Sequence, residues 1–313
     1  MTRTVLVVVG FTVLALTVIS ATDQWPQFRG PQAGIADDDP ALPDVWSETQ
    51  NIVWKASIPG QSWSSPVVWD DHIFVTSAIS SGQEPAPVKG LADPTAMGER
   101  SFAAHRWMVY DVDFKTGRIR WERELRRETP PIARHNRNSY ATETPVTDGE
   151  RVYVYFGSVG LVAALDLKGS VTWTKNVGAF ESLYGWGMAH SPVLFKNRLY
   201  IVNDNNTRSF IAAFDTRTGD EIWKVDRDEV EGFSTPFVWE NTVRTEIVTV
   251  GGRKARSYDL NGTLLWQITG MSDFGTIATP FARHGLIYLS SGYPGSGRRP
   301  VLRFVRARRE RLG

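Results

Sequence analysis

The sequence predicts an all-β protein built as a β-propeller, and three features of the chain lead to this fold class. A Ser/Thr-Pro pair recurs five times, with prolines 79, 47, 44 and 44 residues apart. An Asp, a short turn with Gly and then a Trp follow each of the first four pairs, with 7 or 8 residues from Asp to Trp. Each unit also holds four short runs of β-type residues. Four short strands in each repeat of about 44–50 residues are typical of propeller blades.

Both markers keep a fixed order along the chain. The Ser/Thr-Pro pairs are Ser65-Pro66, Thr144-Pro145, Ser191-Pro192, Thr235-Pro236 and Thr279-Pro280. The Asp and Trp markers are Asp113 with Trp121, Asp166 with Trp173, Asp215 with Trp223, and Asp259 with Trp266. Two independent markers that alternate four times favour a repeat architecture over a β-sandwich.

The first element is a predicted signal peptide at residues 1–21. Arg3 precedes an apolar run over residues 5–19, which is too short to span a bilayer comfortably. Ser20 and Ala21 offer a small-residue cleavage site, and an uncleaved anchor is the alternative. We expect an exported protein, periplasmic or extracellular, with no membrane span after cleavage.

The propeller itself is predicted over residues 22–297. Within a unit, a short apolar run follows the Pro, a turn follows, and a second run is rich in β-branched and aromatic residues, as in residues 66–69 and 72–76. Asp, Asn and Gly occupy the turns because they tolerate positive φ. A third run leads to the Asp marker and a fourth carries the Trp. The mature chain shows no helical periodicity of useful length.

Two insertions interrupt the repeat. Residues 79–106 are rich in Gly and Pro and lack a strand pattern. Residues 126–139 form a second predicted loop with four Arg and one His. Loops on a rigid scaffold often carry function, and a solvated linker is the alternative interpretation.

The fifth unit is interrupted by a basic segment. It begins normally with Thr279-Pro280 and a strand at residues 286–290, but residues 298–313 hold seven Arg and one Glu where the Asp and Trp markers are expected. We interpret this segment as a basic tail that arises by truncation or a change of frame, so that about five blades of a seven- or eight-bladed ring are visible. A functional basic tail is the alternative.

Composition excludes several kinds of site. The chain has no Cys, so it has no disulfide, thiolate metal site, thiol nucleophile or lipidated Cys. A net charge of +1 gives no electrostatic reason to expect nucleic-acid binding. The segment Asn203-Asp204-Asn205-Asn206 suggests a calcium loop, but it lacks the Gly and terminal Glu of such a loop, so we interpret it as a polar turn.

These motifs resemble the PQQ-like (pyrrolo-quinoline quinone repeat) β-propellers of exported bacterial proteins. The resemblance rests on Asp-x-x-Thr-Gly-x-x-x-Trp with the preceding Ser/Thr-Pro strand, on the opening Trp25-Pro26-Gln27-Phe28-Arg29-Gly30, and on Asn51-Ile52-Val53-Trp54-Lys55. It covers about residues 24–297. The WD40 and kelch propellers are alternatives, but the Gly-His and Trp-Asp pattern of WD40 is absent.

The resemblance implies structural and functional roles. In such propellers an outer-strand Trp docks between neighbouring blades, which implies structural roles for Trp54, Trp121, Trp173, Trp223 and Trp266. An N-terminal strand like residues 51–55 completes the last blade there. Family members include quinone-dependent dehydrogenases, which hold PQQ and calcium in the central funnel and often use adjacent cysteines, and scaffolds that organise other proteins. Because this chain has no Cys and is about half as long as those enzymes, we expect no cofactor.

Candidate binding residues follow from propeller geometry. The innermost strands converge on the central channel, so the residues just before each Ser/Thr-Pro pair should surround its mouth. The candidates are Glu143, His190, Trp186, Trp63, Tyr140, Arg134, His135 and Asn138. Glu143 and His190 are the titratable pair among them, either as an acid–base or ligand-binding pair or as two separately hydrogen-bonded residues. No catalytic residue and no metal ligand can be assigned.

The sequence therefore predicts an exported, non-catalytic propeller scaffold that binds a protein or a small ligand at one face. A PQQ- and calcium-dependent oxidoreductase is the alternative function.

Overall fold

The computed structural model describes residues 24–31, 33–36, 39–83, 97–292 and 297–304. The predicted signal peptide, residues 84–96 of the first insertion and residues 305–313 of the basic tail lie outside the described residues. Among the residues with described structure, no helix has the length and apolar character that crossing a bilayer requires.

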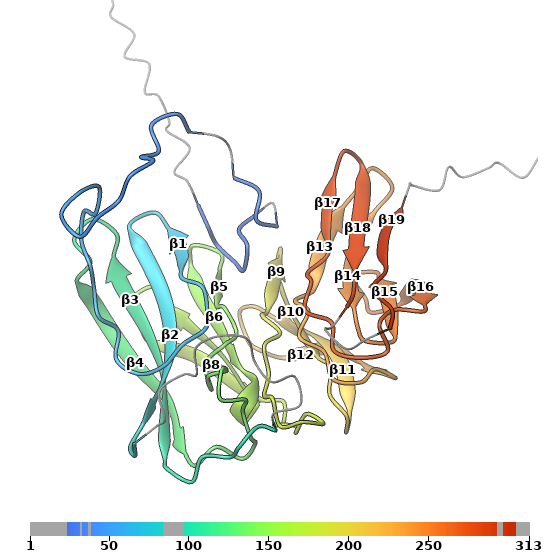
Figure 1. Cartoon of the computed structure of the whole chain (residues 1–313), viewed down its shortest axis with the longest axis horizontal. Helices are drawn as coiled ribbons and strands as arrows, with labels where there is room; N and C mark the ends of the chain where they lie inside the picture. The colour runs from blue at the N-terminus through green and yellow to red at the C-terminus, as the bar shows by residue number, and fades with distance from the viewer. Residues whose placement is uncertain (1–23, 32, 37–38, 84–96, 293–296, 305–313) are drawn as a thin grey trace, which may run out of the picture.

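The described chain folds into five antiparallel sheets (Figure 1). Sheet 1 contains β1 (Val67–Trp69), β2 (His72–Ser80), β3 (His105–Asp113) and β4 (Ile119–Glu128). Sheet 2 contains β5 (Val146–Thr147), β6 (Arg151–Phe156), β7 (Leu161–Asp166) and β8 (Val171–Asn176). Sheet 3 contains β9 (Val193–Phe195), β10 (Arg198–Asn203), β11 (Ser209–Asp215) and β12 (Glu221–Arg227). Sheet 4 contains β13 (Phe237–Glu240), β14 (Thr245–Val250), β15 (Lys254–Tyr258) and β16 (Leu264–Thr269). Sheet 5 contains β17 (Phe281–Arg283), β18 (Leu286–Ser290) and β19 (Val301–Phe304).

The predicted propeller fold is confirmed. Each sheet is a meander in which consecutive strands pair, and a 3₁₀ turn at Gly157–Val159 is the one helical element among the described residues. The first strands of successive sheets contact one another, β1 with β5, β5 with β9, β9 with β13 and β13 with β17. Figure 1 shows sheets 1 and 5 on opposite sides of the molecule, so the five sheets form an open arc.

The recurrent Ser/Thr-Pro pair connects the inner strands. The backbone N–H of Ser65 donates to the hydroxyl of Thr144 at 2.9 Å, that of Thr144 to Ser191 at 3.0 Å, and that of Ser191 to Thr235 at 3.1 Å. Each hydroxyl thus satisfies a backbone donor of the preceding sheet. This pairing matters because a buried donor without a partner is costly.

The outer-strand tryptophans connect neighbouring sheets at the rim. The indole N–H of Trp121 donates to the Leu167 carbonyl, that of Trp173 to Thr216 and that of Trp223 to Leu260, each at 2.9 Å. Every acceptor follows the marker Asp of the next sheet. Trp266 differs, because its indole N–H donates to Glu246 of its own sheet at 2.7 Å while its ring packs beside Phe304 of sheet 5.

The Asp and Gly of each marker shape the turn that receives the indole. The Asp215 carboxylate accepts the backbone N–H groups of Arg217 and Thr218, at 2.9 and 3.1 Å. Gly219 lies at φ +71°, and a Cβ there would lie 2.6 Å from the Trp173 ring. Glycine is needed at this position for both its dihedral angle and its missing side chain.

The opening Trp-Pro-Gln-Phe-Arg-Gly motif crosses the inner strands. The backbone of Trp25 exchanges two hydrogen bonds with Val68 of β1, and the N–H of Thr147 donates to the Pro26 carbonyl at 2.9 Å. Beyond this point Phe28 lines a small cavity together with Phe237 of β13. The N-terminal segment thereby ties inner strands of different sheets to one another.

Three predicted boundaries are corrected by strand pairing. The predicted insertion at residues 79–106 is shorter than expected, because Ile79 pairs with Arg106 and Ser80 with His105. Strand β4 continues to Glu128, inside the predicted loop at residues 126–139. The propeller also extends past residue 297, because β19 pairs with β18 as a third strand of sheet 5.

Candidate functional site

The segments that precede the inner strands form one face of the propeller, here called the loop face. It comprises residues 59–65, 129–145, 177–192, 228–236 and 270–280. All eight predicted binding residues lie on these segments. The structure places seven of them in an arginine pocket, an aromatic cluster and a buried polar row, and leaves Trp63 exposed.

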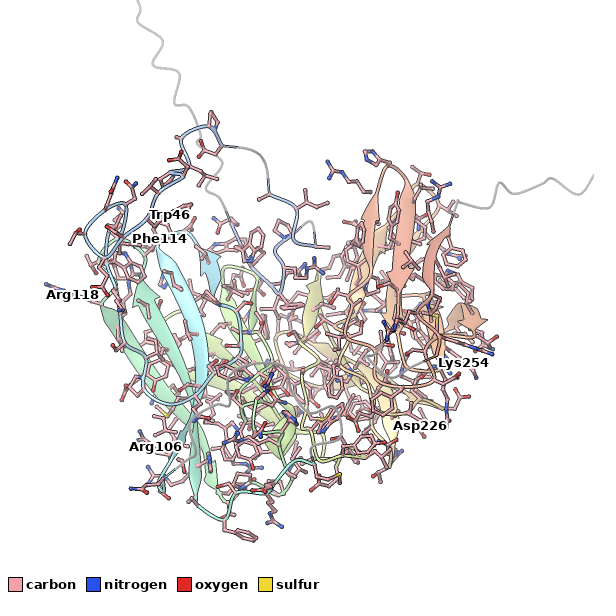
Figure 2. All side chains as sticks on the ribbon, in the orientation of Figure 1. Trp46, Arg106, Phe114, Arg118, Asp226 and Lys254 are labelled. Carbon is pink, nitrogen blue, oxygen red and sulfur yellow. The ribbon has the colours of Figure 1, made fainter. Side chains whose placement is uncertain are left out.

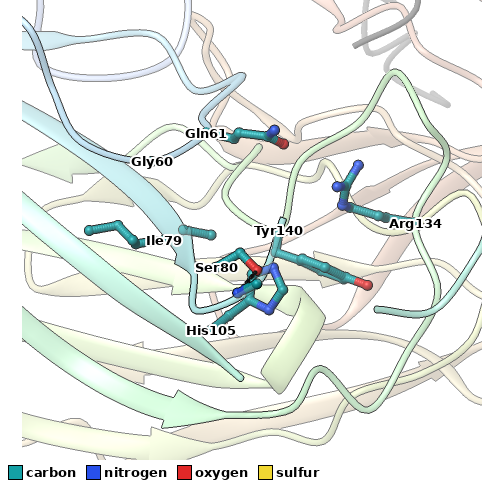
Figure 3. A pocket seen from close by; sticks show the side chains of 9 residues that line it. Gly60, Gln61, Ile79, Ser80, His105, Arg134 and Tyr140 are labelled. Carbon is teal, nitrogen blue, oxygen red and sulfur yellow. Dashed lines mark hydrogen bonds between the residues drawn. The ribbon is translucent and has the colours of Figure 1, made fainter. Parts of the chain in front are cut away.

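The arginine pocket has a volume of about 230 Å³ and lies where β2 and β3 end against the second insertion loop (Figure 3). Figure 3 shows Ser80, His105 and Tyr140 close together, with Arg134 on the neighbouring loop. The Arg134 guanidinium lies 5.2 Å from the Tyr140 ring centroid and donates to the Asn138 carbonyl at 2.9 Å. His105 packs edge-on against Tyr140, with ring centroids 4.9 Å apart.

The chemistry of this pocket favours an anionic or hydrogen-bonding group. None of the nine lining residues that the structure describes is acidic, and Arg134 and His105 are 8% and 2% exposed. A buried guanidinium attracts carboxylate or phosphate oxygens more strongly than an exposed one. The sequence predicted Arg134 and Tyr140. It missed Gln61, Ser80 and His105, because long-range pairing brings them to the pocket: Ser80 pairs with His105, and Gln61 bridges to Ala78 of β2.

An aromatic cluster surrounds Trp186. Its ring centroid lies 5.2 Å from Tyr184, 5.8 Å from Phe274, 5.9 Å from His135 and 6.5 Å from Phe233. The Asn138 amide donates to the Trp186 carbonyl at 2.8 Å, so four loops meet here. Burial lowers the pKa of His135, and Arg137 nearby adds to this effect.

Glu143 and His190 form the buried polar row, but no hydrogen bond joins them. The Glu143 carboxylate accepts the Gly157 backbone N–H at 3.0 Å, and burial raises its pKa to about 7. Both ring nitrogens of His190 are buried without a hydrogen-bond partner among the described residues. Burial lowers the pKa of His190 to about 4, with Asp204 opposing the shift. The structure thus favours two separate buried groups over a coupled acid–base pair.

A buried ion pair beside His190 was not recognised from the sequence. The Arg227 guanidinium donates to both carboxylate oxygens of Asp204, at 2.7 and 2.9 Å, and also to Thr249 and Tyr258. The side chains of Asp204 and Arg227 are 2% and 0% exposed. Because Arg227 occupies the Asp204 carboxylate, the 203–206 segment serves as a polar turn. Asp204 and Arg227 are 23 positions apart along the chain, and no motif in the sequence indicated that they pair.

Three segments of the loop face also carry exposed apolar side chains. Trp63, Leu183 and Ile277 are 46%, 57% and 61% exposed. The Trp63 indole N–H donates to the Arg137 carbonyl, so one edge of its ring is fixed while the rest remains accessible. Large apolar groups that gather on one face mark an interaction surface more often than scattered ones do.

The donor set at the channel does not fit a calcium-bound quinone. Glu143 is the one carboxylate among the residues just before the five Ser/Thr-Pro pairs, and its raised pKa favours the protonated form. Within the described ranges, no group of three or more Asp, Glu or His side chains is arranged to hold a metal ion. Calcium prefers several carboxylate and carbonyl oxygens.

Comparison with known proteins gives one family match. The family model described as outer membrane protein assembly factor BamB matches residues 35–180 and 158–293. None of the curated proteins matches the sequence.

Solved structures of two kinds are similar to the chain. BamB from Moraxella catarrhalis is 15% identical, over 77% of this chain and 73% of that one, with a TM-score of 0.45. Quinohemoprotein alcohol dehydrogenase from Comamonas testosteroni is 14% identical, over 90% of this chain and 46% of that one, with a TM-score of 0.51. A europium-containing methanol dehydrogenase is 11% identical, over 70% of this chain and 43% of that one, with a TM-score of 0.46. The chain spans less than half the length of either dehydrogenase, and this level of identity indicates a common fold alone.

Proposed function

The chain belongs to the family of the outer membrane protein assembly factor BamB, and from this premise we propose that it is an exported, non-catalytic propeller scaffold that binds another protein through its loop face. The observation that carries the proposal is that three loops of this face expose a large apolar side chain, Trp63, Leu183 and Ile277, each 46% exposed or more. Partly fixed aromatic side chains of this kind dominate protein interfaces.

The buried polar residues beneath this face support a structural role for themselves. Asp204 and Arg227 satisfy each other, and Glu143 is held by the backbone of Gly157. These groups hold the loops in place beneath the apolar side chains. The arginine pocket at the edge of the face is suited to an acidic side chain of the partner.

Site-specific photocrosslinking tests the proposed binding face. A photoreactive residue at Leu183 should give a discrete adduct with one envelope protein in cells. The matched control is Val171, 42% exposed on the outer strand β8, which should give none. Absence of an adduct at both Leu183 and Ile277, or an equal yield at Val171, would contradict the proposal.

The alternative function, a quinone-dependent dehydrogenase, has a direct test. We expect the Tm followed by circular dichroism to stay the same when calcium and PQQ are added, because Glu143, with a raised pKa, is the one carboxylate among the residues just before the five Ser/Thr-Pro pairs. A rise in Tm would show that the folded chain binds the cofactor and would favour the enzyme.

A further inference from the structure

The loop between β8 and β9 contains a tight turn over residues 182–186, here called the 182–186 turn. The Gly185 N–H donates to the Ser182 carbonyl at 3.0 Å, and the Trp186 N–H donates to the Ser182 hydroxyl at 2.7 Å. Gly185 lies at φ +65°, a backbone conformation that glycine adopts without strain. The turn carries both the exposed Leu183 and the ring at the centre of the aromatic cluster.

Three other segments of the loop region form hydrogen bonds to the 182–186 turn. The Glu231 carboxylate, on the loop after sheet 3, accepts the Leu183 N–H at 2.6 Å. The Gly98 N–H, on the segment before β3, donates to the Tyr184 carbonyl at 2.7 Å. The Asn138 amide, on the loop after sheet 1, donates to the last carbonyl of the turn at 2.8 Å. The turn is therefore the place where loops of three different sheets are joined.

Gly98 shows how closely these segments approach one another. A Cβ on Gly98 would collide with the Gly185 carbonyl and would lie 2.9 Å from the carbonyl carbon of Arg134. Figure 2 shows Arg106, at the start of β3, and Asp226, near the end of β12, on opposite sides of the lower part of the molecule, and the loop-face segments run between them (Figure 1). Segments that enter the loop face from opposite sides thus meet at the 182–186 turn.

Glu231 supplies the carboxylate that holds this turn. The residue is 1% exposed, and its Oε1 atom is buried without a hydrogen-bond partner among the described residues. Burial raises the pKa of Glu231, and the N–H groups of Leu183 and Tyr184 oppose this shift. An apolar side chain would be far less costly to bury at this position. The buried carboxylate is therefore best explained by the backbone N–H that it accepts.

The same contact occurs one repeat earlier. Glu231 lies eight residues after Trp223 of β12. Glu181 lies eight residues after Trp173 of β8, and its carboxylate accepts the Ala133 N–H at 3.1 Å. In both repeats a Glu after the outer strand holds the backbone of the preceding loop. Of the two held loops, the one with the 182–186 turn exposes a large apolar side chain, Leu183.

We propose that the 182–186 turn is the recognition element of the loop face and that Glu231 is the residue that positions it, an inference that rests on the binding function proposed above. A loop that is already ordered loses less conformational entropy when it binds a partner. Leu183 is 57% exposed and can contact a partner, whereas Glu231 is 1% exposed and acts through the turn.

Two variants of the full chain separate positioning from simple filling of space. Glu231→Met and Glu231→Gln have similar volumes, but Gln alone keeps an oxygen that can accept the Leu183 N–H. For Glu231→Met we expect several-fold faster hydrogen exchange in a peptide covering residues 181–188, measured by mass spectrometry. Glu231→Gln should stay near the parent. Unchanged exchange in Glu231→Met would overturn the positioning role.

Glu246→Met is the matched control for a general loss of stability. Glu246 is 4% exposed, and its carboxylate accepts the Trp266 indole N–H within sheet 4. Its replacement should lower the Tm, because a polar group loses its acceptor, but should leave exchange of residues 181–188 unchanged. Equal acceleration in Glu231→Met and Glu246→Met would show general loosening and would also overturn the positioning role.

Photocrosslinking from Ile277, on a different loop from the 182–186 turn, tests recognition. Glu231→Met should lower the yield of the adduct several-fold at equal amounts of folded protein, while Glu231→Gln and Glu246→Met should preserve it. An unchanged yield together with faster exchange would overturn the recognition role of the turn and leave the proposed function standing. Absence of an adduct in the parent would contradict the proposed function itself, and the exchange experiment would still decide whether Glu231 positions the turn.

Discussion

Docking of single indoles at the sheet boundaries is the main contribution of individual residues to the fold. Trp223 places its ring over Gly262 and its N–H on the Leu260 carbonyl. An indole buries on the order of 150–250 Å² of surface, and its N–H needs one hydrogen-bond acceptor. The Trp223 contact provides both a packing surface and an acceptor.

Trp223→Ala should therefore lower the free energy of unfolding by roughly 3–5 kcal/mol. Chemical denaturation measures the change. Trp46→Ala is the control, because Trp46 is 58% exposed and its loss should change stability little. An unchanged denaturation midpoint for Trp223→Ala would show that the contact is not stabilising.

The glycines beneath the indoles allow a sharper comparison. Gly219 and Gly285 share φ +71°, but a Cβ on Gly219 would lie 2.6 Å from Trp173 while one on Gly285 would meet nothing within 4 Å. Both Ala variants carry the left-handed backbone penalty of about 1–2 kcal/mol. We expect Gly219→Ala to cost several-fold more stability than Gly285→Ala in thermal melts. Equal losses would mean that the dihedral angle alone requires glycine.

At the scale of elements, the inner strands are joined by hydroxyls rather than by strand pairing. Thr144 accepts the N–H of Ser65 and donates its own N–H to Ser191, so one residue links three sheets. The Pro that follows fixes φ and has no N–H that would need an acceptor. The recurrence of Ser/Thr-Pro therefore has a specific structural cause.

Thr144→Val tests the linkage between elements. The substitution preserves shape but leaves the partly buried Ser65 N–H without the Thr144 hydroxyl as acceptor, and we expect a loss of about 1 kcal/mol. Thr174→Val, at an exposed position in β8, is the matched control and should change stability little. Comparable denaturation midpoints for the two variants would argue against a stabilising role for the Ser/Thr hydroxyls that join the inner strands.

At the scale of the whole molecule, the pH dependence of stability combines Glu143 and His190. Because the folded pKa of Glu143 is raised to about 7, the folded state holds a proton that the unfolded state releases, and this group lowers stability as pH rises from 4.5 to 7. Because the folded pKa of His190 is lowered to about 4, His190 raises stability as pH rises from 4 to 6.5. The two contributions oppose each other over most of this range.

Substituting one of the two titratable residues should reveal the pH dependence that the other gives to stability. Relative to the parent, Glu143→Gln should gain stability as pH rises, by about 3 kcal/mol between pH 4 and pH 8. His190→Asn should show the opposite slope relative to the parent. Denaturation across this pH range measures both, and parallel curves for parent and variants would show that the two groups titrate normally in the folded protein.

The sequence by itself determined the repeat, the strand order within each unit and the family, because each depends on local spacing. A period of about 44 residues and an Asp, Gly and Trp at fixed separation can be recognised without knowing what they contact. The same local reasoning placed eight candidate residues on three of the five segments of the loop face, since these segments precede Ser/Thr-Pro pairs. It overestimated both insertions, because composition does not reveal long-range pairs such as Ser80 with His105.

Only the tertiary structure decided which candidates meet. Glu143 and His190 occupy equivalent positions in neighbouring repeats but share no hydrogen bond, whereas Asp204 and Arg227 pair without any sequence signal. The arginine pocket likewise needs strands from sheet 1 and a loop that leads to sheet 2. Such contacts depend on the angle between neighbouring sheets around the channel. Packing between the sheets sets this angle, and the residues within any one repeat do not determine it.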